Sequence, residues 1–426
     1  MKVLIVGSGG REHALAWKIA QSPQADKVFC APGNGGTRLV AENVPIDETN
    51  IAGLVEFATR EAVGLTVVGP EVPLMLGIAD EFESRGLKIF GPTKKAAEIE
   101  GSKVFAKQFM ERHKIPTARF QVVDSFEQAK KAFESGDFGW PVVVKADGLA
   151  AGKGAVVCPS AKRAEETARE MLVLKKYGSA GRRVVIEEFL RGREVSFIVI
   201  SDGTRVQPLV SAMDHKAAYD GDKGPNTGGM GAISPSPFMT EGLFMDAMNS
   251  VIYPTITRLL EEGRKFKGVL YAGLMLTERG PRVLEFNCRF GDPETQAQLL
   301  RMESDLLELI LAAVDENVLK TEARWSEKPS ACVVVASGGY PVRYEKGKTI
   351  SGLADVAGIP GVSVFHAGTK FDNDVTATSG GRVLGVCASE TTLTETMKKI
   401  YDAIGHIYFE AMHYRRDIGA AKEDLA

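Results

Sequence analysis

The first hundred residues repeat one pattern, and it limits the possible folds more than any other feature of the sequence. A short apolar run ends in a glycine or proline turn, and a helical stretch follows. The clearest runs are Val3–Val6 before Gly7, Leu65–Val68 before Gly69-Pro70, and Leu87–Phe90 before Gly91-Pro92. Strands that alternate with helices pack as a parallel sheet covered on both faces. We therefore predict an α/β fold that begins with a doubly wound parallel sheet, with ligands at the carboxyl ends of its strands.

Changes in this pattern divide the 426 residues into three predicted domains, in keeping with about 100–200 residues per domain. Residues 1–100 form the parallel, Rossmann-like domain. Residues 101–325 become β-rich after Ile115-Pro116 and contain a predicted lid subdomain at about 118–190. Residues 326–426 combine buried strands with an amphipathic helix after Thr391, which predicts a small α+β domain.

Composition excludes several classes of protein. The net charge of −3 lacks the basic excess typical of nucleic-acid binding. No apolar stretch approaches the roughly 18 residues of a membrane span, and the apolar run near the N-terminus is too short for a signal peptide. The five cysteines form no C-x-x-C pair, and the six histidines form no zinc-type pair. We expect a cytoplasmic monomer that acts on small molecules, with no nucleic-acid or membrane partner.

The turn Gly7–Glu12 follows a strand and opens a helix, so its backbone N–H groups are placed to bind a phosphate. Glu12 stands where a dinucleotide fingerprint has its third glycine, and Ala31-Pro32 replaces the acidic residue that would hold a ribose. NAD binding is therefore disfavoured. Two interpretations remain, a sugar-phosphate site and a tight turn without a ligand.

A second glycine-rich segment, Lys145–Gly154, contains Gly152-Lys153-Gly154. Its spacing and the missing Ser or Thr after Lys153 exclude a Walker A loop. A lysine at the end of an apolar strand, as Lys145 is, favours an anion partner over a solvated strand end. We interpret this segment as a turn that closes over nucleotide phosphates.

The most informative segment is Leu284–Glu294. Residues two apart on a strand share a face, so we expect Glu285, Asn287 and Arg289 to point together, away from a core that contains Leu284, Phe286 and Cys288. Carboxylate and amide oxygens suit a hard divalent cation, and the arginine suits a carboxylate or phosphate. The alternative is the polar outer face of an edge strand.

Two further segments are candidate ligand-binding sites only when they are considered together with the segments above. A strand ends at Glu187-Glu188, and the turn after it could bind an adenine edge through backbone groups. Glu194, further along, could then bind a ribose. The alternative is that these glutamates are simply solvated, as surface glutamates commonly are. The stretch Gly224–Gly231, which follows Asp214-His215-Lys216, is too glycine-rich for a helix or a central strand. It is either a loop that approaches a ligand closely or a disordered surface loop.

Together these segments resemble the ATP-grasp ligases, and within them the glycinamide ribonucleotide synthetase (phosphoribosylamine–glycine ligase) family. The similarity extends over essentially the whole chain. The segments that carry it are Pro32–Thr37, Gly69–Leu74, Gly224–Gly231, Arg289–Glu294, Gly339–Pro341, His366–Thr369 and Gly380–Gly385.

The resemblance implies that ATP, glycine and 5-phosphoribosylamine give ADP, phosphate and glycinamide ribonucleotide, a step of purine synthesis. ATP-grasp enzymes activate a carboxylate as an acyl phosphate, here glycyl phosphate, which an amine attacks. Carried over by position, the resemblance implies ATP phosphates at Lys103 and Lys145, adenine at Glu187, Glu188 and Leu190, the ribose of ATP at Glu194, Mg²⁺ or Mn²⁺ at Glu285 and Asn287, and the acyl phosphate and glycine carboxylate near Arg289. Lys153, in the glycine-rich segment, is a further candidate for binding the nucleotide.

The amine substrate is expected on the N-terminal sheet, because the turns there meet at the strand carboxyl ends. The sequence offers no dedicated general base, and the strand Tyr271–Leu276 lacks the further metal carboxylate of many ATP-grasp enzymes, which leaves the number of metal ions open. A sibling ligase or carboxylase for another acid and a non-catalytic nucleotide-binding protein remain as alternatives. The remaining candidate residues are Gly9, Gly10, Gly69, Pro70 and Glu71 for the ribose phosphate, Thr227, Gly228 and Gly229 for substrate, and Asp214 and Asp292 as candidate bases.

Overall fold

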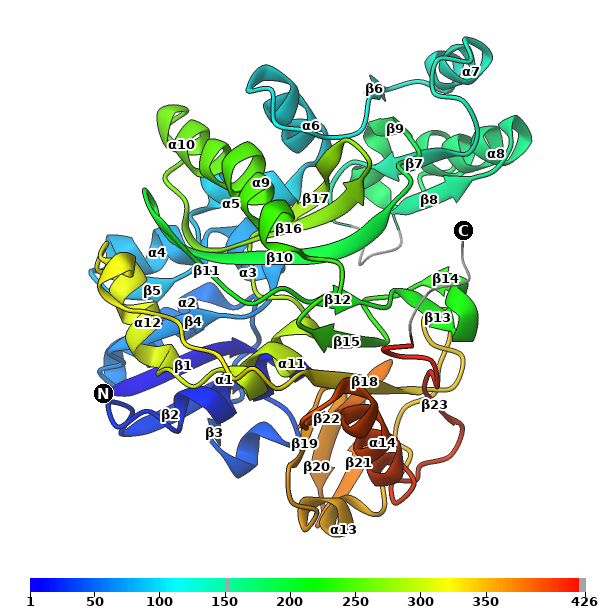
Figure 1. The fold of residues 1–426 in the computed structure, drawn as a ribbon. Coiled ribbons are helices and arrows are strands. Elements are labelled where there is room, and N and C mark those ends of the chain that lie inside the picture. The colour runs from blue at the N-terminus through cyan, green and yellow to red at the C-terminus, as the bar shows by residue number, and fades with distance from the viewer. Residues whose placement is uncertain (150–153, 421–426) are drawn as a thin grey trace.

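The computed structural model describes residues 1–149 and 154–420, and its first hundred residues form the predicted parallel sheet (Figure 1). The strand order is β3-β2-β1-β4-β5, and each neighbouring pair runs parallel. The central strands are buried, as expected where helices cover both faces of a parallel sheet. The elements are β1 Lys2–Gly7, α1 Gly10–Ile19, β2 Lys27–Pro32, β3 Glu42–Asn43, α2 Ile51–Arg60, β4 Leu65–Val68, α3 Glu71–Leu76, α4 Ile78–Ser84, β5 Ile89–Phe90 and α5 Lys94–Gly101.

This strand order makes the turns after β1 and β4 neighbours. The chain crosses from β1 to β2 on one side, whereas β4 pairs with β1 on the other side. A ligand site is expected where the strand order reverses in this way. Gly69 is required there because a Cβ on it would lie 1.9 Å from Glu12 Oε1. The predicted turns therefore do meet at one edge of the sheet.

The central region contains two sheets. Helix α6, Lys103–Arg112, begins at its N-cap Ser102, which accepts the Phe105 N–H, and leads into the lid. The lid is an antiparallel sheet in the order β6-β9-β7-β8, covered by two helices, and it encloses its own apolar core. Its elements are β6 Phe120–Val123, α7 Phe126–Glu134, β7 Val142–Ala146, β8 Ala155–Cys158, α8 Ala161–Leu172 and β9 Val184–Glu188.

The second central sheet has the order β11-β10-β16-β17 and is antiparallel. Its residues Phe197, Leu270 and Phe286 share one core cluster with helices of the N-terminal domain, so this sheet is packed tightly on that domain. The elements are β10 Arg193–Asp202, β11 Val206–Pro208, α9 Glu241–Ala247, α10 Tyr253–Glu261, β16 Lys267–Thr277, β17 Gly280–Asn287, α11 Glu294–Arg301 and α12 Leu306–Val314.

The last sheet joins strands from two parts of the chain. Strands β12 and β15, from the middle of the sequence, extend the C-terminal strands in the order β12-β15-β18-β22-β19, and β23 also pairs with β18. The hairpin β13–β14 leads into the glycine-rich stretch before β15. The elements are β12 Met213–Asp214, β13 Ala217–Tyr219, β14 Lys223–Asn226, β15 Gly231–Ser234, β18 Ser330–Ser337, α13 Leu353–Ala357, β19 Val362–His366, β20 Thr369–Asp372, β21 Val375–Thr378, β22 Arg382–Ser389, α14 Leu393–Ile404 and β23 Met412–His413.

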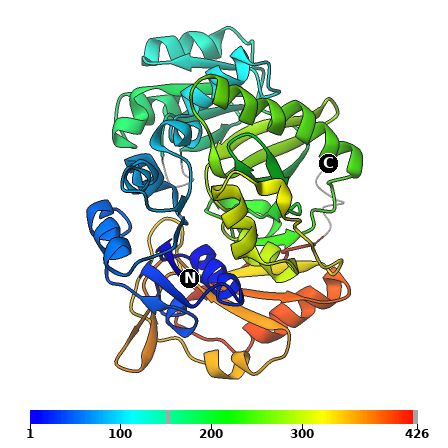
Figure 2. The ribbon, with the colours of Figure 1, turned by 90° about the vertical axis from the view of Figure 1, so that its left-hand side faces the viewer.

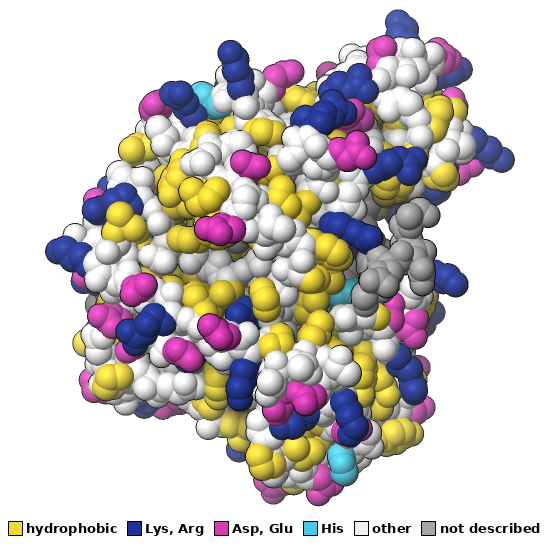
Figure 3. All heavy atoms as spheres, viewed as in Figure 1, with side chains coloured by type: hydrophobic (Ala, Val, Ile, Leu, Met, Phe, Trp, Pro, Cys, Tyr) yellow, Lys and Arg dark blue, Asp and Glu magenta, His cyan; other side chains and the backbone are white. Residues whose placement is uncertain are grey.

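In Figures 1 and 2 the lid lies at the top, the C-terminal sheet at the bottom, and the β10-β16-β17 sheet between them. The lid projects from the body, and on the face in Figure 3 lysine and arginine side chains are interspersed with acidic ones. Among the described helices, none is long and apolar enough to cross a membrane. The five cysteines are free and buried.

Candidate active site

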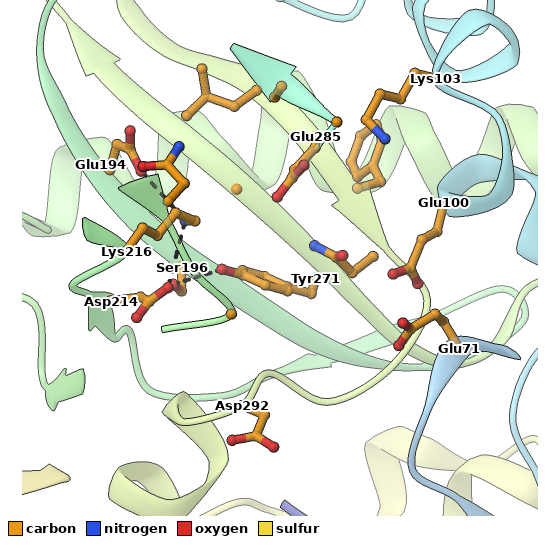
Figure 4. Close-up of a pocket in the computed structure, with 18 of the residues that line it drawn as sticks. Glu71, Glu100, Lys103, Glu194, Ser196, Asp214, Lys216, Tyr271, Glu285 and Asp292 are labelled. Atoms are coloured by element: carbon orange, nitrogen blue, oxygen red, sulfur yellow. Dashed lines mark hydrogen bonds and ion pairs between the residues drawn. The ribbon is translucent and has the colours of Figure 1, made fainter. Parts of the chain in front are cut away.

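A pocket of about 600 Å³ opens between the lid, the central sheet and the two terminal domains. All three predicted domains contribute to its wall, and acidic and basic side chains from several elements point into it (Figure 4). Sixteen of the predicted site residues line this pocket. They are Gly9, Pro70, Glu71, Lys103, Lys145, Glu187, Glu188, Leu190, Glu194, Asp214, Thr227, Gly228, Glu285, Asn287, Arg289 and Asp292.

Three of the predicted residues that the structure describes do not line the pocket. Gly69 and Gly229 lie directly behind the wall, since a Cβ on Gly69 would meet Glu12 and one on Gly229 would lie 2.7 Å from Asp214 Oδ1. Gly10 packs against Gln296 instead. Lys153 lies outside the described residues.

Strand β17 shows the predicted alternation at its end but not at its centre. Phe286 and Cys288 are buried, whereas Glu285 points into the pocket (Figure 4). The expectation that Leu284 faces the core is wrong, because Leu284 lines the pocket. The cause is a β-bulge: Gly273 pairs with Glu285 and Leu274 pairs with Val283, which leaves Leu284 without a partner on β16.

Glu285 and Asn287 are the residues that could hold a divalent cation. No hydrogen bond or ion pair joins the Glu285 carboxylate to another described residue. Burial raises its pKa, but Lys216, Lys103 and other cations outweigh burial, so the pKa lies below its usual value and the carboxylate is ionised. A hard cation therefore fits this pair.

Within the described residues, no group of three or more His, Cys, Asp or Glu side chains is arranged to hold a metal. Any cation on Glu285 and Asn287 would thus take most of its ligands from water and phosphate, as is usual for Mg²⁺.

The Arg289 guanidinium is held by acidic and amide groups from three elements. Its Nε lies 3.2 Å from Glu71 Oε2, its Nη2 lies 3.5 Å from Glu100 Oε1, and Nη2 also donates to Asn287 Oδ1 at 3.2 Å. Glu100 itself accepts the Cys288 N–H at 2.7 Å. Its Nη1 donates to the Phe290 carbonyl at 3.2 Å. These partners fix the orientation of a half-buried guanidinium that lines the pocket, which suits it to an anionic substrate.

Two lysines share one carboxylate at the lid side of the pocket. Lys145 Nζ lies 2.9 Å and Lys107 Nζ 3.1 Å from Glu187 Oε2. Glu188 is bound by the Arg119 backbone N–H and guanidinium, each at 2.9 Å. The Glu188 carboxylate and one Glu187 oxygen are thus engaged, whereas Glu187 Oε1 has no hydrogen-bond partner, so this oxygen and the backbone of the strand end are left to face an adenine edge.

A buried acidic group lies on the opposite side of the pocket. Glu294 Oε1 accepts hydrogen bonds from Tyr271 at 2.7 Å and Ser196 at 2.9 Å. Nearby, Asp214 Oδ1 is buried without a hydrogen-bond partner, and Lys216 Nζ is 3.8 Å from Asp214 Oδ2. Burial, reinforced by Glu294, raises the pKa of Asp214 well above its usual value. Asp214 is thus suited to bind or accept a proton.

The C-terminal domain contributes two side chains to the pocket, Arg382 and Tyr340. Arg382 Nη1 donates to the carbonyls of Gly228 at 2.6 Å and Asp292 at 2.7 Å. Tyr340 accepts the Gly228 N–H at 3.2 Å. The glycine-rich loop is therefore clamped in place, and it is not the disordered surface loop that was the alternative.

Asp292, the second candidate base, is already paired. Arg382 Nη2 lies 3.4 Å from its carboxylate, and Gln296 donates to it at 2.8 Å. Burial raises the pKa of Asp292, but Arg382 and Arg11 hold it below its usual value. An ionised, ion-paired carboxylate is a weaker candidate for a base than Asp214.

At the N-terminal turn, Glu12 occupies part of the expected phosphate site. Its carboxylate accepts the Gly9 N–H at 2.5 Å and also binds Arg11 Nε at 2.6 Å. The Gly9 donor predicted for a phosphate is therefore engaged, because Glu12 caps its own helix. Glu48 lies in the same part of the pocket, and burial and the Glu12 charge raise its pKa to about 7.

Sequence reasoning missed Lys107, Glu100, Tyr271 and Arg382. Lys107 follows Lys103 by four residues, so helical spacing placed the two on one face. Arg382 follows a Gly-Gly pair within a segment singled out for its resemblance, but its reach to Gly228 depends on a contact across 154 residues. Tyr271 and Glu100 gave no local signal, since Tyr271 lies in a mostly apolar strand and Glu100 lies in a helix with several other charged residues.

Comparison with known proteins agrees with this architecture. Three family models match consecutive parts of the chain. They are the phosphoribosylglycinamide synthetase N domain at residues 1–100, its ATP-grasp (A) domain at 101–295, and its C domain at 330–421.

Relatives match over nearly the full length. The phosphoribosylamine–glycine ligase of Vibrio parahaemolyticus is 50% identical over 422 residues, and that of Escherichia coli is 50% identical over 423 residues, with 98% of each chain covered in both cases. The crystal structure of the Thermotoga maritima phosphoribosylamine–glycine ligase superposes with a TM-score of 0.86 at 33% identity, covering 98% of this chain and 100% of that one. The chain belongs to the phosphoribosylglycinamide synthetase family, with an ATP-grasp central domain.

Proposed function

We propose that this chain joins glycine to 5-phosphoribosylamine at the expense of ATP, giving glycinamide ribonucleotide, ADP and phosphate in purine biosynthesis. The observation that carries the proposal is a pocket built by all three domains of a chain that matches phosphoribosylamine–glycine ligases over 98% of its length. Its wall combines lysines suited to phosphates, oxygen ligands for a cation and a half-buried arginine.

The reaction takes two steps. A glycine carboxylate oxygen attacks the γ-phosphorus of ATP, ADP leaves, and glycyl phosphate forms. The amine of phosphoribosylamine then attacks the acyl carbon, phosphate leaves, and the nitrogen loses a proton. A carboxylate is a poor electrophile and phosphate is a good leaving group, so the protein mainly positions the reactants and neutralises charge.

The lysines of the lid side support the nucleotide part of this proposal. Lys145 reaches the pocket from β7, and Lys103 from the first turn of α6, where its Nζ donates to the Gly148 carbonyl at 3.0 Å. Both are suited to the phosphates of ATP. Glu285 and Asn287 would hold Mg²⁺ or Mn²⁺, which supplies charge neutralisation between the phosphates.

Arg289 and Asp214 suit the two ends of glycine. Arg289 is a half-buried guanidinium that is already oriented by Glu71 and Glu100, so it supports binding of the carboxylate that becomes the acyl phosphate. Asp214 offers a buried carboxylate oxygen without a partner, and it is the better of the two candidates for a group that accepts a proton from an amine.

The N-terminal side of the pocket is assigned to phosphoribosylamine. Glu48 and Glu71 can accept hydrogen bonds from ribose hydroxyls, and Arg11 and Arg382 are cations at the same end. This arrangement differs from the expected backbone site, since Glu12 already uses the Gly9 N–H. It directs the amine toward an acyl phosphate near Arg289.

The test is ADP release measured with glycine, with and without freshly generated phosphoribosylamine. We expect rapid ADP release only when both are present, with glycinamide ribonucleotide as the product. Bicarbonate and other small acids in place of glycine serve as controls for a sibling enzyme. Turnover with one of these acids, and none with glycine, would refute the assignment.

We also propose that the chain acts in the cytoplasm as a monomer. Five free, buried cysteines support a reducing compartment, and the site in the described residues is assembled from one chain. Sedimentation of the purified protein tests whether it is a monomer.

A further inference from the structure

The lid and the body are joined by a buried cluster of three charged side chains. Lys107 extends from α6, Lys145 from β7 and Glu187 from β9, and both ammonium groups bind the same carboxylate oxygen, at 3.1 and 2.9 Å. All three residues are buried, with 2%, 7% and 1% of their surface exposed. The other oxygen of Glu187 is buried without a hydrogen-bond partner.

The charges of this cluster do not balance, since two lysines meet one carboxylate. The pKa of Lys107 is lowered to about 8, because burial and the neighbouring Lys145 charge lower it more than Glu187 raises it. Glu188 is the other charged group that acts on it from β9. An excess of positive charge in a buried place is costly unless an anion is bound. Lys145 and Lys107 both line the nucleotide pocket, so the excess positive charge is directed there.

The same cluster links the lid to strand β17 beside the predicted metal ligand. Lys107 donates to Thr117 Oγ1 at 2.7 Å, and Thr117 donates to the Val283 carbonyl at 2.6 Å. Lys145 donates to the Leu284 carbonyl at 3.0 Å, at the β-bulge. The lid encloses its own core, so these polar contacts help set where β9 lies relative to the body.

We propose that Lys107 is a positioning residue for nucleotide binding, which acts by sharing the charge of Glu187. When Lys107 is charged, the Glu187 carboxylate is shared between two ammonium groups. Lys145 is then only partly neutralised, and its remaining positive charge attracts phosphates. Without that charge, Glu187 and Lys145 neutralise each other. The inference rests on the proposed function only in that the pocket binds ATP.

The test is direct binding of a fluorescent ADP analogue with Mg²⁺, which requires no turnover. Wild type is compared with Lys107→Met, which removes the charge at similar length, and Lys107→Arg, which keeps a charge that does not titrate. Lys130→Met is the matched control, because Lys130 is an exposed lid lysine paired with Glu134 at 3.7 Å on α7.

At about pH 7 we expect Lys107→Met to bind about tenfold more weakly, equivalent to about 1.4 kcal/mol. Raising the pH to about 9.5 should weaken the wild type and Lys130→Met as Lys107 loses its proton, but leave both Lys107 variants unaffected. Lys107→Arg should keep most of the affinity at about pH 7.

The proposal is overturned if Lys107→Met binds like wild type, or if Lys107→Arg shows the same alkaline loss as wild type. Should Lys107→Met fail to fold, the pH dependence of wild type and Lys107→Arg still decides. Absence of nucleotide binding by the wild type would count against the proposed function instead.

Discussion

Replacing Glu285 by glutamine tests whether the charge of this carboxylate is needed to bind the metal ion. The change keeps the size and one oxygen of the side chain but removes the only carboxylate of the Glu285–Asn287 pair. Glutamine is still able to coordinate, so the loss comes from charge rather than from shape. The ordered cations Lys216, Lys103 and Lys145, which now lower the pKa of Glu285, would remain in place.

The magnitude follows from Coulomb energies. A carboxylate and a divalent cation about 4 Å apart interact by about 8 kcal/mol at an effective dielectric constant of about 20. Part of this is regained, because the lysines near Glu285 lose a competitor and attract the ATP phosphates more strongly. A net loss of about 3 kcal/mol remains, which lowers the turnover rate roughly 100-fold.

The assay is ADP release at a series of Mg²⁺ concentrations. Glu278→Gln is the control, since Glu278 is exposed at the turn between β16 and β17. The Glu285 variant should fold normally and regain activity as Mg²⁺ or Mn²⁺ rises, whereas the control should match wild type. Wild-type activity at ordinary Mg²⁺ would remove Glu285 from the metal site.

Three further predictions concern the remaining parts of the site and its surroundings. Gly9→Val should raise KM for phosphoribosylamine and leave nucleotide binding nearly unchanged, because its side chain would displace the Glu12 carboxylate, 2.6 Å from the Cβ position; lost nucleotide affinity with normal phosphoribosylamine saturation would contradict this. Arg382→Met should lower kcat about tenfold or more by releasing Gly228, with Arg382→Lys restoring only part, because one ammonium group cannot replace both Nη1, which binds the two carbonyls, and Nη2, which lies 3.4 Å from the Asp292 carboxylate; full rescue by lysine would contradict this. Burial lowers the pKa values of His13 and His366 to about 3 and 4, so the free energy of unfolding should fall as the pH drops from about 6.5 toward these values. In urea unfolding, a His13→Gln variant should lose less of this free energy over the same pH range than the wild type.

The sequence allowed the N-terminal sheet to be predicted closely. Leu65–Val68 is a strand with the expected bounds, and α6 begins at the expected N-cap, Ser102. Local signals sufficed for β1 and β4 because each is an apolar run that ends at a glycine or proline turn, whereas the polar edge strand β3, Glu42–Asn43, carried no such signal. The face shared by Glu285 and Asn287 was likewise predictable from the period of a strand.

Features that depend on distant contacts were not predictable. The bulge that turns Leu284 into the pocket depends on the register with β16, and the pairing of β12 and β15 with the C-terminal sheet joins segments about 100 residues apart. In the sequence Lys107 is an ordinary helical lysine, and only the fold brings it into contact with Glu187. These positions share one cause: their neighbours are far away in the chain.

The most direct test of the central claim follows an oxygen atom. Glycine labelled in its carboxylate with the heavy oxygen isotope is incubated with ATP, Mg²⁺ and freshly generated phosphoribosylamine, and the phosphate and the ribonucleotide product are analysed by mass spectrometry. If glycine is activated as an acyl phosphate, one labelled oxygen must appear in the released phosphate and the other must stay in the amide of glycinamide ribonucleotide. Unlabelled phosphate, or ADP release without the glycinamide product, would contradict the account.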